Sequence, residues 1–118
     1  MPVIEISTLP TTEDIDLPTA LGDIATEVAD FLGEEPRGTW AIHRPIAPGS
    51  YAEGRDAPNS QPPQTHPALV RVLANREPEE ASGLMKAIGD AVVRAFALEE
   101  GNVVVVWEPA DPARMFWG

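Results

Sequence analysis

The chain has 118 residues, no cysteine and a formal net charge of −11 at pH 7, because 19 Asp and Glu outnumber eight Lys and Arg. A chain of this length supports one compact domain that buries roughly two-thirds of its unfolded surface. The acidic balance argues against a nucleic acid duplex or an anionic membrane as partner, because both are bound through basic residues that neutralise phosphate. Without cysteine, neither a disulfide framework nor a thiolate nucleophile is available.

Targeting and metal-binding patterns are also missing from the sequence. No apolar run reaches membrane length, and no charged segment followed by an apolar one opens the chain, so we expect a cytoplasmic protein. The two histidines, His43 and His66, give no metal-ligand spacing in a chain without cysteine. We therefore expect neither a metal nor another cofactor, and we interpret His43 as a strand residue making an ordinary hydrogen bond.

The first half of the chain predicts a strand, a helix and a second strand. Residues 3–8, VIEIST, alternate apolar and polar, which is typical of a half-buried strand. From Pro18 a helix is predicted, with Asp16 as its cap and a buried stripe at spacings of three and four formed by Leu21, Ile24, Val28, Phe31 and Leu32. Residues 39–46, TWAIHRPI, predict the second strand, and residues 47–54 predict a turn or small hairpin.

The second half repeats this order of elements. Residues 68–75, ALVRVLAN, predict a strand, and residues 103–109, VVVVWEP, predict another. Between them, residues 76–98 predict a helix whose apolar stripe consists of Leu84, Met85, Ile88, Val92, Ala95 and Phe96. The two helices superpose at an offset of roughly 64 residues and the two first strands at roughly 66. The sequence therefore predicts a duplicated βαβ unit.

The duplication defines the expected domain layout. We interpret residues 1–118 as one domain of two repeats, residues 2–54 and residues 68–118, joined by a proline-rich linker at 55–67. The fold class is α+β. Each βαβ unit has a right-handed crossover, so the two units form a four-stranded mixed sheet with both helices on one face. The other face is left uncovered, although the valines at 103–106 are typical of a strand buried on both sides, and we expect oligomerisation to cover it.

One pair of side chains tests this arrangement. Glu5 and Arg71 occupy matching positions in the two first strands and point away from the helices. If these strands lie antiparallel at the centre of the sheet, the two side chains should pair.

Three segments carry a resemblance to a known family. Residues 70–80, VRVLANREPEE, look like the strand, arginine and acidic helix start of 4-oxalocrotonate tautomerase. Residues 46–54, IAPGSYAEG, resemble the hairpin after the second strand of that family. Residues 107–118 are similar in layout to the tails of macrophage migration inhibitory factor and cis-3-chloroacrylic acid dehalogenase. With an N-terminal proline opening the first strand and a duplicated βαβ unit, the chain resembles the tautomerase superfamily.

The resemblance implies a homotrimer in which the uncovered sheet faces turn inward to form a central barrel. Members of this superfamily use the amino-terminal proline as acid or base on small α-keto, enol or halo acids, and arginines hold the carboxylate. By this resemblance Pro2 matches the catalytic proline and Arg76 matches the arginine at the strand-to-helix junction. The second-strand arginine falls on Trp40, and Arg37 and Arg44 are near enough to substitute for it.

Other positions complete the expected site. Tyr51 and Phe116 are candidates for pocket walls, because each follows the outgoing strand of its unit, and Trp40 adds a third aromatic ring. The glutamate near the end of the dehalogenases falls on Phe116, which argues against dehalogenation by activated water. A carboxylate-bearing small molecule is therefore the expected substrate.

The chemistry of Pro2 depends on removal of Met1. A free α-amine titrates near pH 8, and burial or a nearby guanidinium lowers that value, so Pro2 would be neutral at pH 7 and able to move a proton α to a carbonyl. Arg76 would grip a carboxylate in two places and stabilise an enolate. Three functions stay open on the sequence: a proline-based tautomerase or isomerase, a decarboxylase or dehalogenase of the same superfamily, and a trimeric binding protein that has lost the chemistry.

Overall fold

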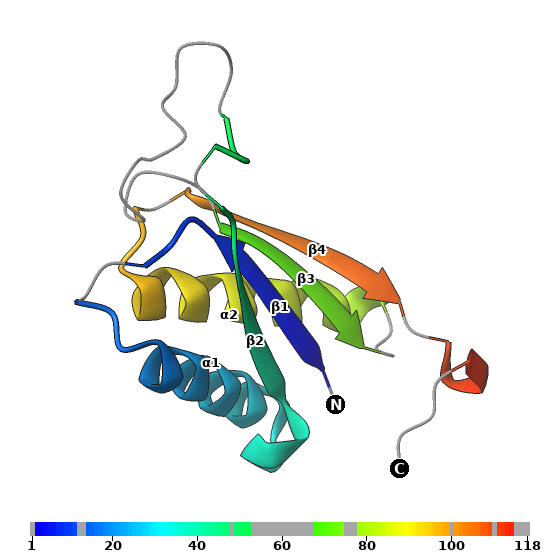
Figure 1. Ribbon diagram of the computed structural model, residues 1–118. Helices are drawn as coiled ribbons and strands as arrows, with labels where there is room; N and C mark the ends of the chain where they lie inside the picture. The colour runs from blue at the N-terminus through cyan, green and yellow to red at the C-terminus, as the bar shows by residue number, and fades with distance from the viewer. Residues whose placement is uncertain are drawn as a thin grey trace.

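The computed structural model describes residues 2–11, 14–47, 49–52, 68–74, 78–99, 101–109 and 111–114 (Figure 1). It contains four strands, two long helices and two short 3-10 helices in these residues. In chain order they are β1 (Val3–Thr8), α1 (Leu17–Leu32), η1 (Pro36–Gly38), β2 (Trp40–Pro45), β3 (Ala68–Ala74), α2 (Pro78–Phe96), β4 (Val103–Pro109) and η3 (Pro112–Arg114). The predicted strands and helices are confirmed, with ends that shift by one or two residues.

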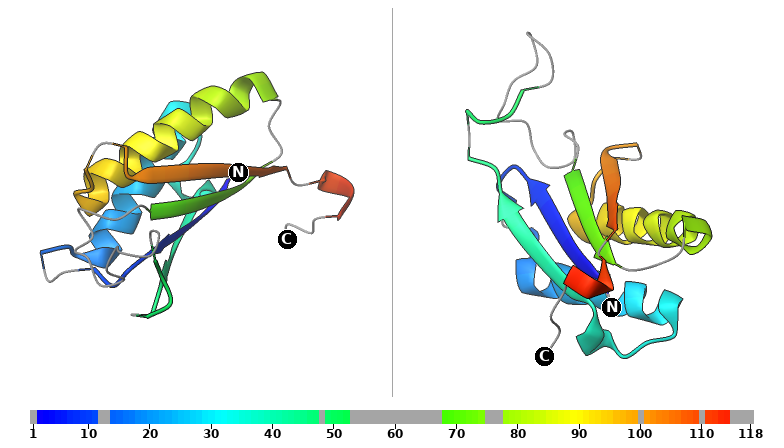
Figure 2. Two further views of the ribbon diagram at one scale, coloured as in Figure 1. Left: turned by 90° about the horizontal axis from the view of Figure 1, so that it is seen from above. Right: turned by 90° about the vertical axis from the view of Figure 1, so that its right-hand side faces the viewer.

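The four strands form one mixed sheet in the order β2-β1-β3-β4. β1 pairs with β2 in parallel and β3 pairs with β4 in parallel, so each half of the chain is a βαβ unit. The two halves meet where β1 and β3 run antiparallel at the centre. Both helices cover the same face of the sheet (Figures 1 and 2). The predicted four-stranded sheet with two helices on one face is therefore confirmed.

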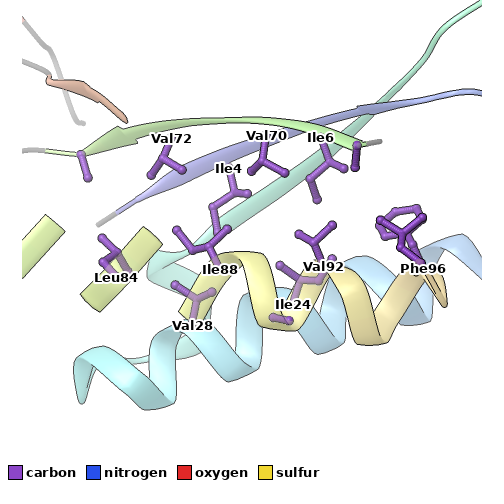
Figure 3. Close-up of a cluster of buried hydrophobic side chains, with 14 residues drawn as sticks. Ile4, Ile6, Ile24, Val28, Val70, Val72, Leu84, Ile88, Val92 and Phe96 are labelled. Atoms are coloured by element: carbon purple, nitrogen blue, oxygen red, sulfur yellow. The ribbon is translucent and has the colours of Figure 1, made fainter. Parts of the chain in front are cut away.

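The hydrophobic core lies between this face and the helices (Figure 3). Alternate residues of β1 and β3 point into it, and both helices turn their apolar stripes toward them, as strand and helix periodicities require. The fully buried larger side chains of this cluster are Ile4, Ile6, Ile24, Val28, Val70, Val72, Leu84, Ile88, Val92 and Phe96. Within the described residues, no helix has both the length and the apolar character needed to cross a membrane.

Phe31 departs from the predicted stripe of α1. Its side chain is 55% exposed, whereas Ala29 is fully buried. A Cβ on Gly83 of α2 would lie 3.4 Å from the Phe31 ring, so Phe31 lies along the neighbouring helix and not under the sheet. It borders an open groove between α1 and α2. The prediction was wrong because α1 packs against two surfaces, the sheet and α2, whereas a single stripe describes only one.

The end of α1 and the segment after β2 are both turns. Gly33 has a φ of 68°, and its N–H bonds to the Asp30 carbonyl at 3.2 Å while Glu34 N–H bonds to the Ala29 carbonyl at 2.9 Å, which is a Schellman motif. After β2, Ser50 N–H donates to the Ala47 carbonyl at 2.9 Å. The predicted turn is present there, whereas residues 53–54 and the predicted linker at 55–67 lie outside the described residues.

The sheet face opposite the helices is exposed, and we call it the open face. Apart from Phe31, the exposed large hydrophobic side chains of the described residues all lie on it: Trp40, Ile42, Leu69, Leu73, Val104 and Val106. A chain of ion pairs crosses this apolar surface. Arg71 contacts Glu108 at 2.8 Å and Glu5 at 3.3 Å, and Arg44 contacts Glu5 at 3.0 Å. Glu5 is opposite Arg71 in the β1–β3 register, so the predicted pair is confirmed.

Candidate active site

Pro2 lies at the start of the central strand β1, between β2 and β3. The residue is buried, and its carbonyl accepts a hydrogen bond of 3.1 Å from the Trp40 N–H of β2. This bond continues the parallel ladder, in which Val3 is opposite Trp40. The surrounding backbone therefore holds Pro2 in an ordered position at the end of a strand.

Two strands, β1 and β2, begin and two strands, β3 and β4, end at this end of the sheet, which we call the Pro2 edge. Val3 is opposite Leu73 of the antiparallel β3, so β3 ends where β1 begins. Leu73 is in turn opposite Glu108, so β4 ends at the same edge. The N-terminus, η1 and the arrowheads of β3 and β4 gather at this end of the sheet (Figures 1 and 2). Arg76 and Phe116 follow β3 and β4 in the chain, but both lie outside the described residues.

The structure separates the two arginines predicted near β2. Arg44 is opposite Ser7, toward the other end of β1, and its guanidinium contacts Glu5 at 3.0 Å. Arg37 lies in η1, three residues before Trp40, and is exposed. Lys86 and Arg94 are paired with carboxylates on the helices, at 2.8 Å and 2.5 Å respectively. Among the described residues, Arg37 is the cation without an ion-pair partner.

Of the predicted aromatic walls, the two that the structure describes, Trp40 and Tyr51, do not come together within one chain. The Trp40 side chain is half exposed on the open face at the Pro2 edge. Tyr51 lies near Ser7 and Leu69, at the opposite end of β1. There it lines an apolar hollow of about 220 Å³ with Ser7, Ile46, Ala68, Leu69 and Val104. Pro2 and Tyr51 of one chain therefore belong to different ends of the sheet.

Two polar side chains on the helix face were not predicted as parts of a site. Thr39 is only 4% exposed, and its Oγ1 has no hydrogen-bond partner among the described residues. Thr8 is fully buried, and its Oγ1 is 2.8 Å from His43 Nε2, which confirms the hydrogen bond expected for His43. No sequence pattern marks Thr39. Only the register of the sheet, which places Thr39 directly before the second strand and opposite Pro2, points to it.

The charges of the open face neutralise one another. Arg71 donates from Nε and Nη2 to the two carboxylate oxygens of Glu108, at 2.8 and 3.0 Å. This bidentate contact lowers the pKa of Glu108, and the carboxylates of Glu108 and Glu5 raise the pKa of Arg71. Glu108 is therefore ionised and paired with Arg71 at neutral pH. Among the described residues, no group of three His, Asp or Glu side chains is arranged to hold a metal ion.

Comparison with known proteins identifies the fold. No family model matches the sequence, and no curated protein matches it. Solved structures match in three dimensions at low identity. Native fused 4-OT superposes with a TM-score of 0.80 at 12% identity, over 98% of this chain and 92% of that chain. Malonate semialdehyde decarboxylase gives 0.72 at 14% identity, over 98% and 90%. Macrophage migration inhibitory factor from Giardia lamblia gives 0.64 at 14% identity, over 91% and 97%. The chain therefore has the fold of the tautomerase superfamily.

Proposed function

We propose that the protein is a proline-based tautomerase or isomerase acting on a small keto or enol acid that carries a carboxylate. Pro2 is its general base and acid, and Arg76 is its carboxylate and enolate anchor. The observation that carries this proposal is the position of Pro2, buried at the start of a central strand on an edge shared by four strand ends. The fold shared with fused 4-OT supports it.

The chemistry follows from a free Pro2 nitrogen. Once Met1 is removed, this nitrogen is a secondary amine with an ordinary pKa of about 8 for an α-amino group. Burial disfavours the charged form and lowers this value, so the neutral base is available at pH 7. It removes a proton α to the substrate carbonyl, the enolate forms, and the proton returns to another carbon. Solved structures of malonate semialdehyde decarboxylase include a mutant that replaces its first residue, a proline, by alanine.

We propose Arg37 as the second anion-binding residue. It would replace the second-strand arginine of 4-oxalocrotonate tautomerase, whose position is occupied here by Trp40. Arg37 precedes Trp40 by three residues, which is at most about 10 Å of backbone, and an arginine side chain adds further reach. Arg44 suits this role less well, because Glu5 occupies its guanidinium. The unpaired charge of Arg37 supports binding of a carboxylate, whereas Val3, Trp40 and Leu73 supply an apolar surface for the rest of the substrate.

A homotrimer formed through the open face is part of this proposal. One similar structure is a fused 4-OT wild-type symmetric trimer, with a TM-score of 0.75 at 17% identity over 96% of this chain and 89% of that chain. Closure of three sheets would cover the apolar side chains of the open face. Because Tyr51 and Pro2 lie at opposite ends of β1, Tyr51 would reach a Pro2 site only from a neighbouring subunit.

Decarboxylation is the second candidate function. The similarity to malonate semialdehyde decarboxylase favours it, because that structure is described as a basis for decarboxylase and hydratase activities on the same fold. Loss of carbon dioxide from a β-keto acid also leaves an enolate, which the same arginines would stabilise. The two functions differ in their product, so one assay can separate them.

The test follows the absorbance of 2-hydroxydienoates and of phenylenolpyruvate during ketonisation, on protein whose N-terminus has been verified by mass. We expect activity only in chains that begin at Pro2. Arg76→Ala should lower kcat/KM by the equivalent of about 2 to 4 kcal/mol, because a poorly solvated bidentate contact to the developing charge is lost. Arg37→Ala should mainly raise KM, and Pro2→Ala should retain part of the activity through its primary amine.

Arg94→Ala is the matched control, because Arg94 lies on α2 and pairs with Glu27 away from the Pro2 edge. It should leave kcat/KM unchanged. Full activity with Met1 still attached would reject the proline mechanism, and so would the absence of turnover by processed protein on every such acid. A β-keto acid is assayed in parallel for release of carbon dioxide, and such release without ketonisation of the enol acids would replace the tautomerase by the decarboxylase.

A further inference from the structure

The starting observation is the buried hydroxyl of Thr39. Its Oγ1 has no hydrogen-bond partner among the described residues, in a side chain that is 4% exposed. Burying a hydroxyl without a partner is destabilising, and most buried polar groups in folded proteins are paired. We therefore expect a hydrogen-bond donor or acceptor to come close to the Thr39 hydroxyl.

The register of the sheet places Thr39 beside Pro2. Val3 is opposite Trp40 in the parallel pair, so the same register continued by one residue puts Thr39 opposite Pro2. Thr39 has an extended backbone, with φ −110° and ψ 122°. Since side chains alternate along extended chains and Trp40 lies on the open face, Thr39 points to the helix face, as Pro2 does.

The Pro2 nitrogen faces the same strand. In an extended residue the backbone nitrogen and carbonyl point to the same neighbouring strand. The Pro2 carbonyl bonds to Trp40 N–H of β2, so the nitrogen of Pro2 is also directed toward the junction of η1 and β2. Continued by one residue, the parallel register directs this nitrogen toward the Gly38 carbonyl and places Thr39 opposite Pro2.

We propose that Thr39 Oγ1 accepts a hydrogen bond from the Pro2 nitrogen once Met1 has been removed. With Met1 attached, this nitrogen is a proline amide without a hydrogen, and Thr39 has nothing to accept from it. A neutral secondary amine carries one N–H and one lone pair. Thr39 accepts a hydrogen bond from this N–H, so the lone pair of the amine stays free to receive the substrate proton. The substrate C–H bond breaks, its proton forms a second N–H, and that proton alone is returned.

Thr39 is thus a positioning residue for the base. This role rests on the proposed function in one respect only, which is that Pro2 must have a free amine. Among the described residues, the charged groups on the neighbouring elements include Arg37, Glu34 and Glu35 around η1 and Glu108 at the end of β4. Glu108 is held by Arg71. Because a hydroxyl accepts more strongly from the protonated amine than from the neutral one, Thr39 favours the protonated form.

The first test measures the Pro2 amine without any substrate. The protein is labelled with ¹⁵N-proline, its N-terminus is checked by mass, and the Pro2 nitrogen is titrated by NMR. In Thr39→Val the pKa of Pro2 should fall by about 0.5 to 1 unit, the equivalent of one net hydrogen bond. Thr39→Ser keeps the hydroxyl and should keep the wild-type pKa.

The second test compares thermal stability in the two N-terminal forms, obtained with methionine aminopeptidase active or inhibited. With Met1 retained, Thr39→Val removes an unpartnered hydroxyl without changing the shape of the side chain, so Tm should rise by about 3 °C or more. In the processed form the same substitution removes a made hydrogen bond, so Tm should not rise. The difference between the two forms is the signature of the contact.

The outcomes separate the contact from the enzyme. An unchanged pKa in Thr39→Val, together with equal Tm shifts in the two forms, would overturn the proposal whatever the activity, and would favour the Gly38 carbonyl as acceptor. A lowered pKa with form-dependent Tm shifts would support it even if no acid were turned over, in which case only the tautomerase function would be rejected.

Discussion

His43 shows how one half-buried residue links pH to stability. Its Nε2 is 2.8 Å from Thr8 Oγ1, and its ring centroid is 5.6 Å from that of Phe96. Because Thr8 Oγ1 donates its hydrogen to the Leu9 carbonyl at 2.7 Å, we assign the His43 hydrogen to Nε2, which donates to Thr8. Burial lowers the pKa of His43.

A depressed pKa in the folded state means that the folded chain binds a proton less readily than the unfolded chain. The stability contributed by neutral His43 is therefore present above the unfolded pKa of about 6.5 and is lost as the pH falls below it. We expect Tm to decrease from pH 7.5 to pH 5, and His43→Gln to flatten this decrease. His66→Gln is the control for the other histidine, and equal flattening by both variants would contradict the assignment to His43.

Single residues of the site differ in how far the sequence predicts them. The roles of Pro2 and Arg76 stay predictions that rest on the resemblance to the tautomerase superfamily: the structure describes the position of Pro2, whereas Arg76 lies outside the described residues. The choice between Arg37 and Arg44 does not follow from the sequence, since it depends on Glu5 reaching Arg44 across a parallel pair of strands. Thr39 was missed because an unpartnered buried hydroxyl is a property of the packed structure.

At the scale of elements, the periodicity of apolar residues predicted all four strands and both helices. Strands of six or seven residues and helices of 16 and 19 residues provide enough repeats of each period to be distinguished. The confirmed Glu5–Arg71 pair shows that the register of β1 and β3 was also predictable from matching positions in the two repeats. Phe31 was not predictable, because a sequence does not state which of two surfaces the last turn of α1 contacts.

Two glycines of α1 give opposite predictions for the same substitution. A Cβ on Gly22 would meet nothing within 4 Å, so Gly22→Ala should stabilise the protein by about 0.5 to 1 kcal/mol through helix propensity. Gly33 has a φ of 68° and closes the Schellman motif, so Gly33→Ala should destabilise it by about 1 kcal/mol. Urea unfolding of both variants measures the two signs, and destabilisation by Gly22→Ala would show that residue 22 is not in a helix interior.

At the scale of the whole molecule, charge and apolar surface are divided between two faces. Helix α1 contains Asp23, Glu27 and Asp30 and no Lys or Arg. The open face carries two cations and two anions that pair with one another, amid the exposed apolar side chains. In a chain with a net charge of −11, the open face is thus the surface where copies can approach without strong repulsion.

The proposed trimer predicts different effects for two apolar-to-acidic substitutions. Val104 is 51% exposed on the open face and Phe31 is 55% exposed on the helix side. Val104→Asp should shift the protein from trimer to monomer in sedimentation at micromolar concentration, because it buries an unpaired carboxylate at the interface. Phe31→Asp should leave the association state unchanged. A wild-type monomer at that concentration would contradict the trimer.

The pairing of Glu5 with Arg71 has a consequence for how the two halves of the chain recognise each other. These residues are 66 positions apart and lie at the middle of the β1–β3 register. A free-standing first half would offer the unpaired edge of β1, and two copies meeting in the same register would set Glu5 against Glu5. Two copies of the second half would set Arg71 against Arg71. Like charges directly opposite are destabilising and unlike charges are favourable. The Glu5–Arg71 pair therefore favours contact between the two different halves of the chain over contact between two copies of the same half.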